Sequence, residues 1–161
     1  MNESEHLANA LVDSILEDEN GWFLPLYEAL EGLTAEQAAR SPGEKFNSPW
    51  SIVRHMAYWT EVIKLRLEGK DPTQTLGEDW DALPAADSEE AWAADKLHLE
   101  TVTSELAEIV RGWDTAFMDQ PYRQRKHSHR QVIQGLIGHN CYHTNEVISM
   151  RHMLGYWLEE T

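Results

Sequence analysis

Residues 48–69, SPWSIVRHMAYWTEVIKLRLEG, carry the signals that begin and end a helix. Ser48 is a residue type that caps helix N-termini, and Pro49 suits the first helical position because proline has no N–H to donate. Gly69 suits the position just past the last turn, where the backbone often becomes left-handed. The apolar residues in between recur at helical spacing, so the segment predicts a long amphipathic helix.

The segment before it has the same helical periodicity, and no part of the chain has the sustained alternation of a β-strand. This first helix should run from about Ser4 to Glu31, with a kink where Gly21 and Pro25 interrupt it. A short helical turn should follow at Thr34, which stands three residues before a glutamine in the pattern of a capping box.

Two further helices follow residues 48–69. One should begin at Asp87, which forms a capping-box pattern with Glu90, and should end at Gly112. The other should follow Ser128 and end near Gly155. These two segments bring the number of predicted long helices to four.

Two long polar connections, residues 71–87 and 113–128, separate these helices. The first is rich in turn-forming and acidic residues, too polar for a core, and long enough to cross a helical bundle. Four amphipathic helices with such connections are typical of a four-helix bundle with crossover connections. Because 161 residues suit one domain with a substantial core, we expect a single all-α bundle over residues 1–161.

The charge balance limits the partners that the protein can have. The chain has 28 acidic and 13 basic residues, and its formal charge of −15 repels nucleic acids and anionic membranes. Its single cysteine, Cys141, excludes an intramolecular disulfide and a cysteine-rich zinc module. The acidic N-terminal stretch does not look like a signal peptide, and no stretch approaches the roughly 20 apolar residues of a membrane span. We therefore expect a cytoplasmic protein that binds neither nucleic acid nor membranes.

Three histidines fall on the inward faces of two predicted helices. In HNCYHTNEV, residues 139–147, His139 and His143 are one turn apart, or about 40° around the helix axis. His55 lies on the apolar stripe of the helix at residues 48–69. The residues that share these stripes are Val132, Leu136, Glu146, Met150 and Met153 on the last helix and Ile52, Trp59 and Val62 on the other.

A lone histidine on an apolar stripe is more often a hydrogen-bonded core residue than a metal ligand. Three buried imidazoles, however, leave several nitrogens without partners, at roughly 1–3 kcal/mol each, and one divalent ion would satisfy three of them. Histidines four residues apart also recur in zinc sites, because both can point at one ion. The pattern therefore predicts a metal site formed by His55, His139 and His143, with coordination positions left open.

Two familiar metal patterns are excluded. A zincin has the motif His-Glu-x-x-His, but Asn140 follows His139. A di-iron carboxylate bundle needs two Glu-x-x-His motifs, whereas this chain has one, from Glu3 to His6, at its start.

Glu146 lies about 20° from the direction of His139 around the helix axis and about one turn beyond His143. We expect it to act as a base beside the metal or to orient a ligand, with a structural salt bridge as the alternative. Cys141 points about 200° away from His139 around the helix, so we expect a buried or interface thiol rather than a nucleophile at the metal.

Other candidate residues have two interpretations each. The basic stretch YRQRKHSHR, residues 122–130, would either attract an anionic substrate or have no site role, as a solvated loop or as a partner for the acidic segment 78–90. Trp50 and Trp59 would either wall the metal pocket or pack in the core. His98 and His152 fit the predicted site poorly and should be surface or packing residues.

Three stretches of the chain together resemble one protein family. They are LEGLTAEQAARSP (residues 30–42), SPWSIVRHMAYW (residues 48–59) and HNCYHTNEVISMRHMLGYW (residues 139–157). They resemble the DinB-like family of four-helix-bundle metalloenzymes, which includes thiol-dependent transferases, and the resemblance spans nearly the whole chain. Asn145 departs from the family pattern, in which glycine is frequent at this position, and this departure bears on helix packing and substrate fit.

Carried over residue by residue, the resemblance puts the family's metal ligands at His55, His139 and His143. It implies a divalent ion such as zinc or nickel, a low-molecular-weight thiol as cosubstrate, and a dimer. Seven tryptophans are many for this length, which also suggests aromatic surface for a homodimer interface. We therefore expect a thiol-dependent S-transferase acting on a small molecule. The alternatives are a metal-dependent hydrolase and a non-catalytic, stress-related bundle that binds metal.

Overall fold

The computed structural model describes residues 1–16, 23–83, 87–124 and 126–157. Within these ranges there are four long helices, α1 (Glu3–Asp13), α4 (Pro49–Leu67), α5 (Glu89–Arg111) and α7 (His129–Leu154). The connections contain the short helices α2 (Leu26–Ala29), α3 (Ala35–Ala39) and α6 (Thr115–Met118) and the 3₁₀ turns η1 (Pro72–Gln74) and η2 (Tyr122–Gln124). The same ranges contain no β-strand, which confirms the predicted all-α class.

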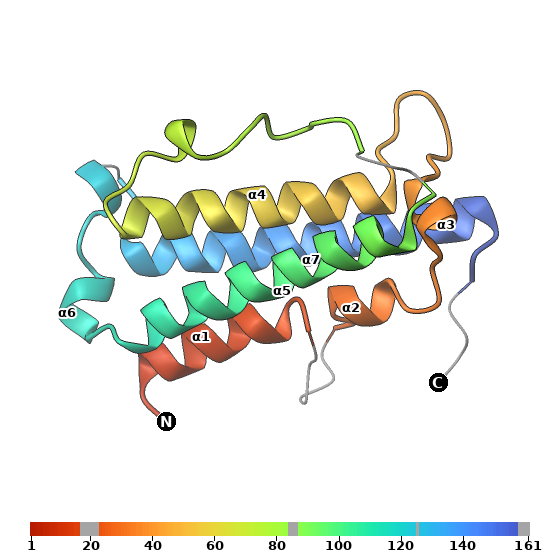
Figure 1. Cartoon of the computed structure of the whole chain (residues 1–161). Helices are drawn as coiled ribbons and strands as arrows, with labels where there is room; N and C mark the ends of the chain where they lie inside the picture. Colours follow the sequence, from red (N-terminus) through yellow and green to blue (C-terminus); the bar gives the residue numbers. More distant parts are fainter. Residues whose placement is uncertain (17–22, 84–86, 125, 158–161) are drawn as a thin grey trace.

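The long helices form one bundle in which α4 and α5 run in the same direction, opposite to α1 and α7 (Figure 1). Both α4 and α1 pack against α5 and α7, so the four helices surround a common core. To join two parallel helices, the chain must return along the length of α4, and residues 70–83 do so on the outside of that helix (Figure 1). The crossover predicted from the length of this connection is therefore confirmed.

The first helix is shorter than predicted. α1 ends at Asp13, where the Ser14 hydroxyl donates a hydrogen bond to a carbonyl of the preceding turn at 2.7 Å. Such side-chain bonds compete with the helical ladder. Pro25 then begins the separate helix α2, so a single kinked helix from Ser4 to Glu31 is wrong. Gly21, one of the two predicted kink positions, lies outside the described residues.

Capping residues determine where the later helices begin. Ser48 caps α4 and Ser128 caps α7, each in a reciprocal capping box with the residue three positions later. α5 begins one residue later than predicted, because Ser88, and not Asp87, accepts the hydrogen bond from the amide of Ala91. The two glutamates that follow Ser88 then lie in the first turn, where the helix dipole favours negative charge.

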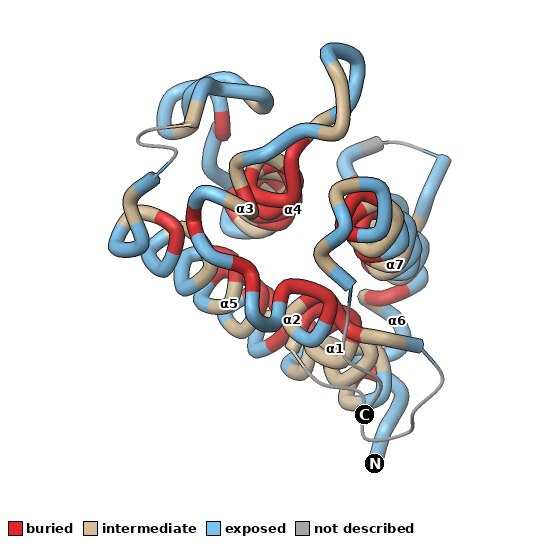
Figure 2. The backbone as a smooth tube through the Cα atoms, turned by 90° about the vertical axis from the view of Figure 1, so that its right-hand side faces the viewer, coloured by how far each residue is buried: buried red, intermediate tan, exposed pale blue. Residues whose placement is uncertain are grey.

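Buried apolar side chains form two clusters along the bundle. One, around Trp50 and Trp92, joins α2 and α3 to the adjoining parts of α4, α5 and α7. The other, which includes Leu11 and Leu106, joins α1 to the opposite parts of α5 and α7. Seen from the end of the bundle, the buried positions of the long helices turn toward the space between them (Figure 2). No helix in the described ranges has the length and apolar composition needed to cross a membrane.

A layer of buried polar residues separates the two apolar clusters. Each long helix contributes to it between members of the two clusters: Ser14 at the end of α1, Thr60 on α4, Thr103 on α5 and Asn140 on α7. The Asn140 side-chain amide donates to the Ser14 hydroxyl at 3.0 Å, which ties α7 to α1. This polar level of α7 is also the level at which the chain places its predicted metal ligands.

Candidate metal centre

The three predicted ligands come together between α4 and α7. His55, His139 and His143 each offer one ring nitrogen, and these nitrogens all lie within 4.8 Å of one another. The closest approach joins the Nε2 atoms of His55 and His139, which are 3.1 Å apart. Two nitrogens that bind one ion at about 2.1 Å lie about 3.0 to 3.4 Å apart for bond angles between 90° and tetrahedral. The observed spacing therefore fits a shared ion.

Carboxylates contact the outer nitrogens of two of these rings. His55 Nδ1 lies 2.6 Å from Asp79 Oδ1, and His143 Nδ1 lies 2.9 Å from Glu146 Oε2. An ionised carboxylate can only accept a hydrogen bond, so each Nδ1 carries the proton and donates it. In a neutral ring the Nε2 atom then keeps its lone pair, which is the form that binds a metal.

The environment also keeps His139 and His143 neutral. Burial, followed by the nearby charges of His143 and His55, lowers the pKa of His139 to about 4. Burial also lowers the pKa of His143, and the hydrogen bond to Glu146 partly opposes it. His139 Nδ1 is buried and has no hydrogen-bond partner among the residues that the structure describes. Three converging imidazoles, one with an orphaned nitrogen, form a donor set that suits a divalent transition-metal ion.

The crossover connection supplies two site residues that the sequence patterns missed. The ring of Trp80 stacks on His55, with centroids 4.1 Å apart and planes 13° apart. The second carboxylate oxygen of Asp79 accepts a hydrogen bond from Trp59 Nε1 at 2.9 Å. The segment 71–87 was predicted to be only a polar connection, because it has no helical periodicity. A tryptophan between two aspartates was the one available signal that part of it packs on the bundle.

A family model of the DinB superfamily matches residues 26–147, which is more than half of the chain. The chain belongs to the DinB superfamily. The match includes all three histidines of the cluster and Glu146. No curated protein and no solved structure gave a match.

The tryptophans of this DinB superfamily member divide between the two interpretations that the sequence left open. Trp50 is a core residue, fully buried against Trp92, and its indole N–H donates to Asp95 at 2.7 Å. Trp59 belongs to the candidate metal centre, since its indole N–H binds the carboxylate that contacts His55.

The inward stripe predicted for the end of α7 is wrong at its last member. Met153 is 61% exposed, whereas Arg151 in the same turn is buried. The Arg151 guanidinium donates to the carbonyls of Ala29 and Glu31 at 2.7 Å each, and to that of Tyr156 at 3.0 Å. The turn thus packs on backbone carbonyls from the α2–α3 region, which need a donor, and an apolar side chain could not bind them.

The other candidate residues on helices lie away from the cluster. Cys141 is partly buried, and burial raises the pKa of its thiol. His98 pairs with Glu61 at 3.1 Å, and His152 is exposed and stacks on Trp157. These positions agree with the predicted surface or packing roles. Asn145, where the family often has glycine, is exposed.

Arg130, the last residue of the basic stretch at residues 122–130, joins the start of α7 to α1 and to the residue after α6. Arg130 makes ion pairs with Asp119, at 3.0 Å, and with Glu3. Both of these partners lie outside the acidic segment 78–90, which was one of the partners considered for the basic stretch. Arg130 also lies about 14 Å along the axis of α7 from His139, because each helical residue advances the chain about 1.5 Å.

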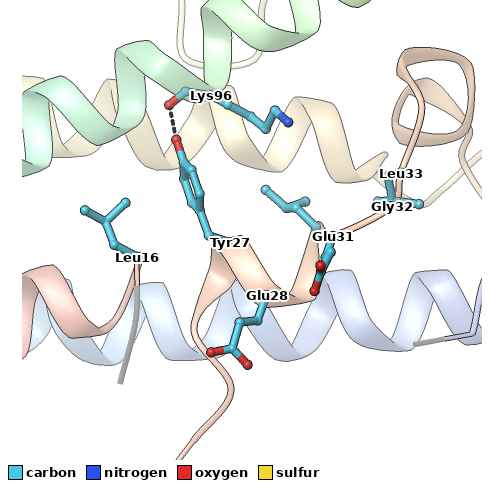
Figure 3. Close-up of a pocket in the computed structure, with 8 residues that line it drawn as sticks. Leu16, Tyr27, Glu28, Glu31, Gly32, Leu33 and Lys96 are labelled. Carbon is cyan, nitrogen blue, oxygen red and sulfur yellow. Dashed lines mark hydrogen bonds between the residues drawn. The ribbon is translucent and has the colours of Figure 1, made fainter. Parts of the chain in front are cut away.

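Several cavities lie beside the part of the bundle that the structure describes. One, about 790 Å³, lies among α2, α3 and the end of α7 and has Arg151 and Tyr156 in its wall. A second, about 410 Å³, lies beside Tyr27, whose hydroxyl donates to the Lys96 carbonyl at 2.7 Å (Figure 3). The third, about 150 Å³, lies between the crossover connection and the α4–α5 pair, and Asp79 is in its wall. Of these three cavities, the third shares a residue, Asp79, with the surroundings of the histidines.

Proposed function

We propose that His55, His139 and His143 bind one divalent metal ion, zinc or nickel, and that the protein is a metal-dependent S-transferase. Its substrates would be a low-molecular-weight thiol and a small electrophile. The observation that carries this proposal is the convergence of three ring nitrogens from two helices within 4.8 Å. Helices that are packed against each other hold such a cluster more rigidly than loops do.

When bound, the ion would supply Lewis acidity that lowers the pKa of a thiol or a water molecule. The protein supplies the geometry. Three protein ligands leave coordination positions open, as in catalytic rather than structural sites. Glu146 accepts a hydrogen bond from the Nδ1–H group of His143. The proton of that ring therefore stays on Nδ1, and Nε2 keeps its lone pair. The expected role of Glu146 as a base stays a prediction, since the contact with His143 already uses one of its oxygens.

Two observations favour an external thiol over water as the nucleophile. The residue after His139 is Asn140, so the glutamate that serves as the base of zincin hydrolases is missing. To ionise near neutral pH, a thiol needs a smaller decrease of its pKa than water does, because the pKa of a free thiol is about 8.5 and that of water 15.7. The chain's own thiol, Cys141, is unsuited, because burial raises its pKa. The thiol would therefore enter as a cosubstrate, as the family resemblance implies.

The test compares metal content with thiol transfer. Elemental analysis of purified wild-type protein should find zinc or nickel, and His55→Ala and His143→Ala should each lose most of it. His98→Ala is the matched control, because His98 is a helical histidine that pairs with Glu61 on the surface. The metal-loaded proteins are then assayed with a panel of low-molecular-weight thiols and a chromogenic electrophile. Transfer should require the metal and be lost in both ligand variants but not in the control.

Other results would each reject part of the proposal. Full metal content in His143→Ala would show that the three-histidine site is wrong. A metal-loaded wild type that hydrolyses esters or amides but transfers no thiol would be a hydrolase. A protein that binds metal and does neither would be the non-catalytic bundle.

A further inference from the structure

We propose that Asp79 is a positioning residue for the metal site and that the α4–α5 connection, which carries it, is a working part of that site. The inference deepens the proposed function and rests on it for the identity of the ligand. Residues 70–83 pass along the outside of α4 (Figure 1), and Asp79 is the point at which this segment reaches the histidine cluster.

The carboxylate of Asp79 bridges two donors that α4 presents one turn apart. His55 and Trp59 are four residues apart, so their side chains lie on the same face of the helix. Oδ1 lies 2.6 Å from His55 Nδ1, and Oδ2 lies 2.9 Å from Trp59 Nε1. Each oxygen thus has one partner, and the carboxylate is held by both ends.

This arrangement determines the tautomer of His55. An indole N–H can only donate, so it orients the carboxylate without competing for the proton between Asp79 and His55. The carboxylate then holds the proton on Nδ1 of His55, so Nε2, 3.1 Å from Nε2 of His139, is the acceptor in that contact and carries the lone pair that an ion would bind. Outer carboxylates of this kind orient metal-binding histidines and raise their basicity.

Further contacts keep the connection in place beside Asp79. The guanidinium of Arg54 donates to the Ala82 carbonyl at 3.1 Å, and Trp80 stacks on His55. Trp80 is 46% exposed, whereas His55 is 7% exposed. The connection therefore covers a ligand that would otherwise face solvent, and its docking and the orientation of His55 depend on each other.

The first test examines the tautomer in metal-free protein and needs no ion. In ¹⁵N-detected imidazole spectra, His55 of the wild type should be protonated at Nδ1 and unprotonated at Nε2. Asp81→Asn is the matched control, because Asp81 is an exposed carboxylate on the same segment. The control should keep this signature. Asp79→Asn should lose it, because Trp59 Nε1 needs the amide oxygen as its acceptor and the NH₂ group is then left facing Nδ1 of His55. A wild-type His55 that carries its proton on Nε2 would overturn the proposal without reference to any variant.

The second test measures zinc affinity by competition with a chelator of known affinity. We expect Asp79→Asn to weaken zinc binding by about 10- to 100-fold, as is usual for loss of such an outer partner. Trp59→Phe, which keeps a ring but removes the donor to Oδ2, should weaken it less, and Asp81→Asn should leave it unchanged. Equal affinity of Asp79→Asn and Asp81→Asn would overturn the positioning role.

The two proposals fail in different ways. If the wild type bound no zinc and no nickel, the proposed function would fail, while the His55 tautomer would still decide whether Asp79 positions that ring. If the wild type bound zinc and transferred thiol but Asp79→Asn were unchanged in affinity and in tautomer, only the present inference would fail.

Discussion

Glu146 contacts His143 through a hydrogen bond of 2.9 Å within one turn of α7. Substitution of Glu146 should therefore disturb the orientation of the His143 ring without removing a metal ligand. In Glu146→Gln the side-chain oxygen can still accept from Nδ1, but the negative charge is gone. We expect the variant to keep its metal, with affinity reduced by about tenfold or more, and to turn over more slowly. Metal content, zinc affinity and thiol transfer are measured beside Glu108→Gln, an exposed carboxylate on α5. Metal loss as complete as in His143→Ala would contradict the orienting role.

The sequence predicts some site residues and not others for a clear reason. His55, His139 and His143 lie on regular helices, where spacing alone says which side chains share a face. Asp79 and Trp80 lie on a connection without periodicity, so their positions depend on how that segment docks on α4. Arg151 was missed for a related reason, since its partners are backbone carbonyls that no side-chain pattern reveals.

The end of α7 provides a prediction for a whole element. Gly155 caps this helix in the left-handed region, with φ 78°, whereas Gly135 lies within the helix, exposed, with no atom near its missing side chain. Gly155→Ala should lower the free energy of unfolding by roughly 1–2 kcal/mol, because an L-residue is strained there. Gly135→Ala should raise it by roughly 0.5–1 kcal/mol, because alanine is the better helix former. Urea unfolding of the metal-free variants measures both, and shifts of the same sign would contradict the assignment.

Helix ends were predictable where a second signal, such as proline at the first helical position, marks one cap, and uncertain where adjacent candidates compete without one. Ser48 and Gly69 delimit α4 as expected, because Pro49 suits the first helical position and so marks Ser48, rather than the adjacent Asn47, as the N-cap. At the start of α5, Asp87 and Ser88 are adjacent and both are good N-caps, so the pattern was off by one residue. The early end of α1 depends on Ser14, whose partner Asn140 comes from the far end of the sequence.

For the whole molecule we propose a homodimer, which the fold leaves open. Large apolar side chains remain exposed on or just after α7, among them Tyr142 at 66% and Trp157 at 67%. Aromatic residues of this kind are enriched at interfaces. Sedimentation velocity at micromolar concentration should give twice the chain mass of 18.5 kDa. A clean monomer at that concentration would contradict the proposal, and Tyr142→Ser should weaken the dimer if α7 forms the interface.

The all-α bundle and its crossover could be predicted from the number, length and polarity of the helical and connecting segments. The division of the core into two apolar clusters could not. Helical patterns mark a residue as inward or outward. They do not show that Ser14 and Asn140 meet, because that contact depends on how the helices are displaced along their axes. The metal ligands of α7, His139 and His143, flank Asn140 and lie between the α7 members of the two apolar clusters.

His55 and His139 are 84 residues apart in the chain, yet their nitrogens are 3.1 Å apart in the fold. An ion held by both would therefore close a very large loop, in the way that a cross-link does. For a covalent link across 84 residues, chain entropy alone corresponds to about 4.5 kcal/mol of stabilisation. A chain whose only cysteine is Cys141 has no disulfide of its own. Removal of the ion by a chelator would then destabilise this bundle much as reduction of a disulfide destabilises a secreted domain, because the cross-link between α4 and α7 would be lost.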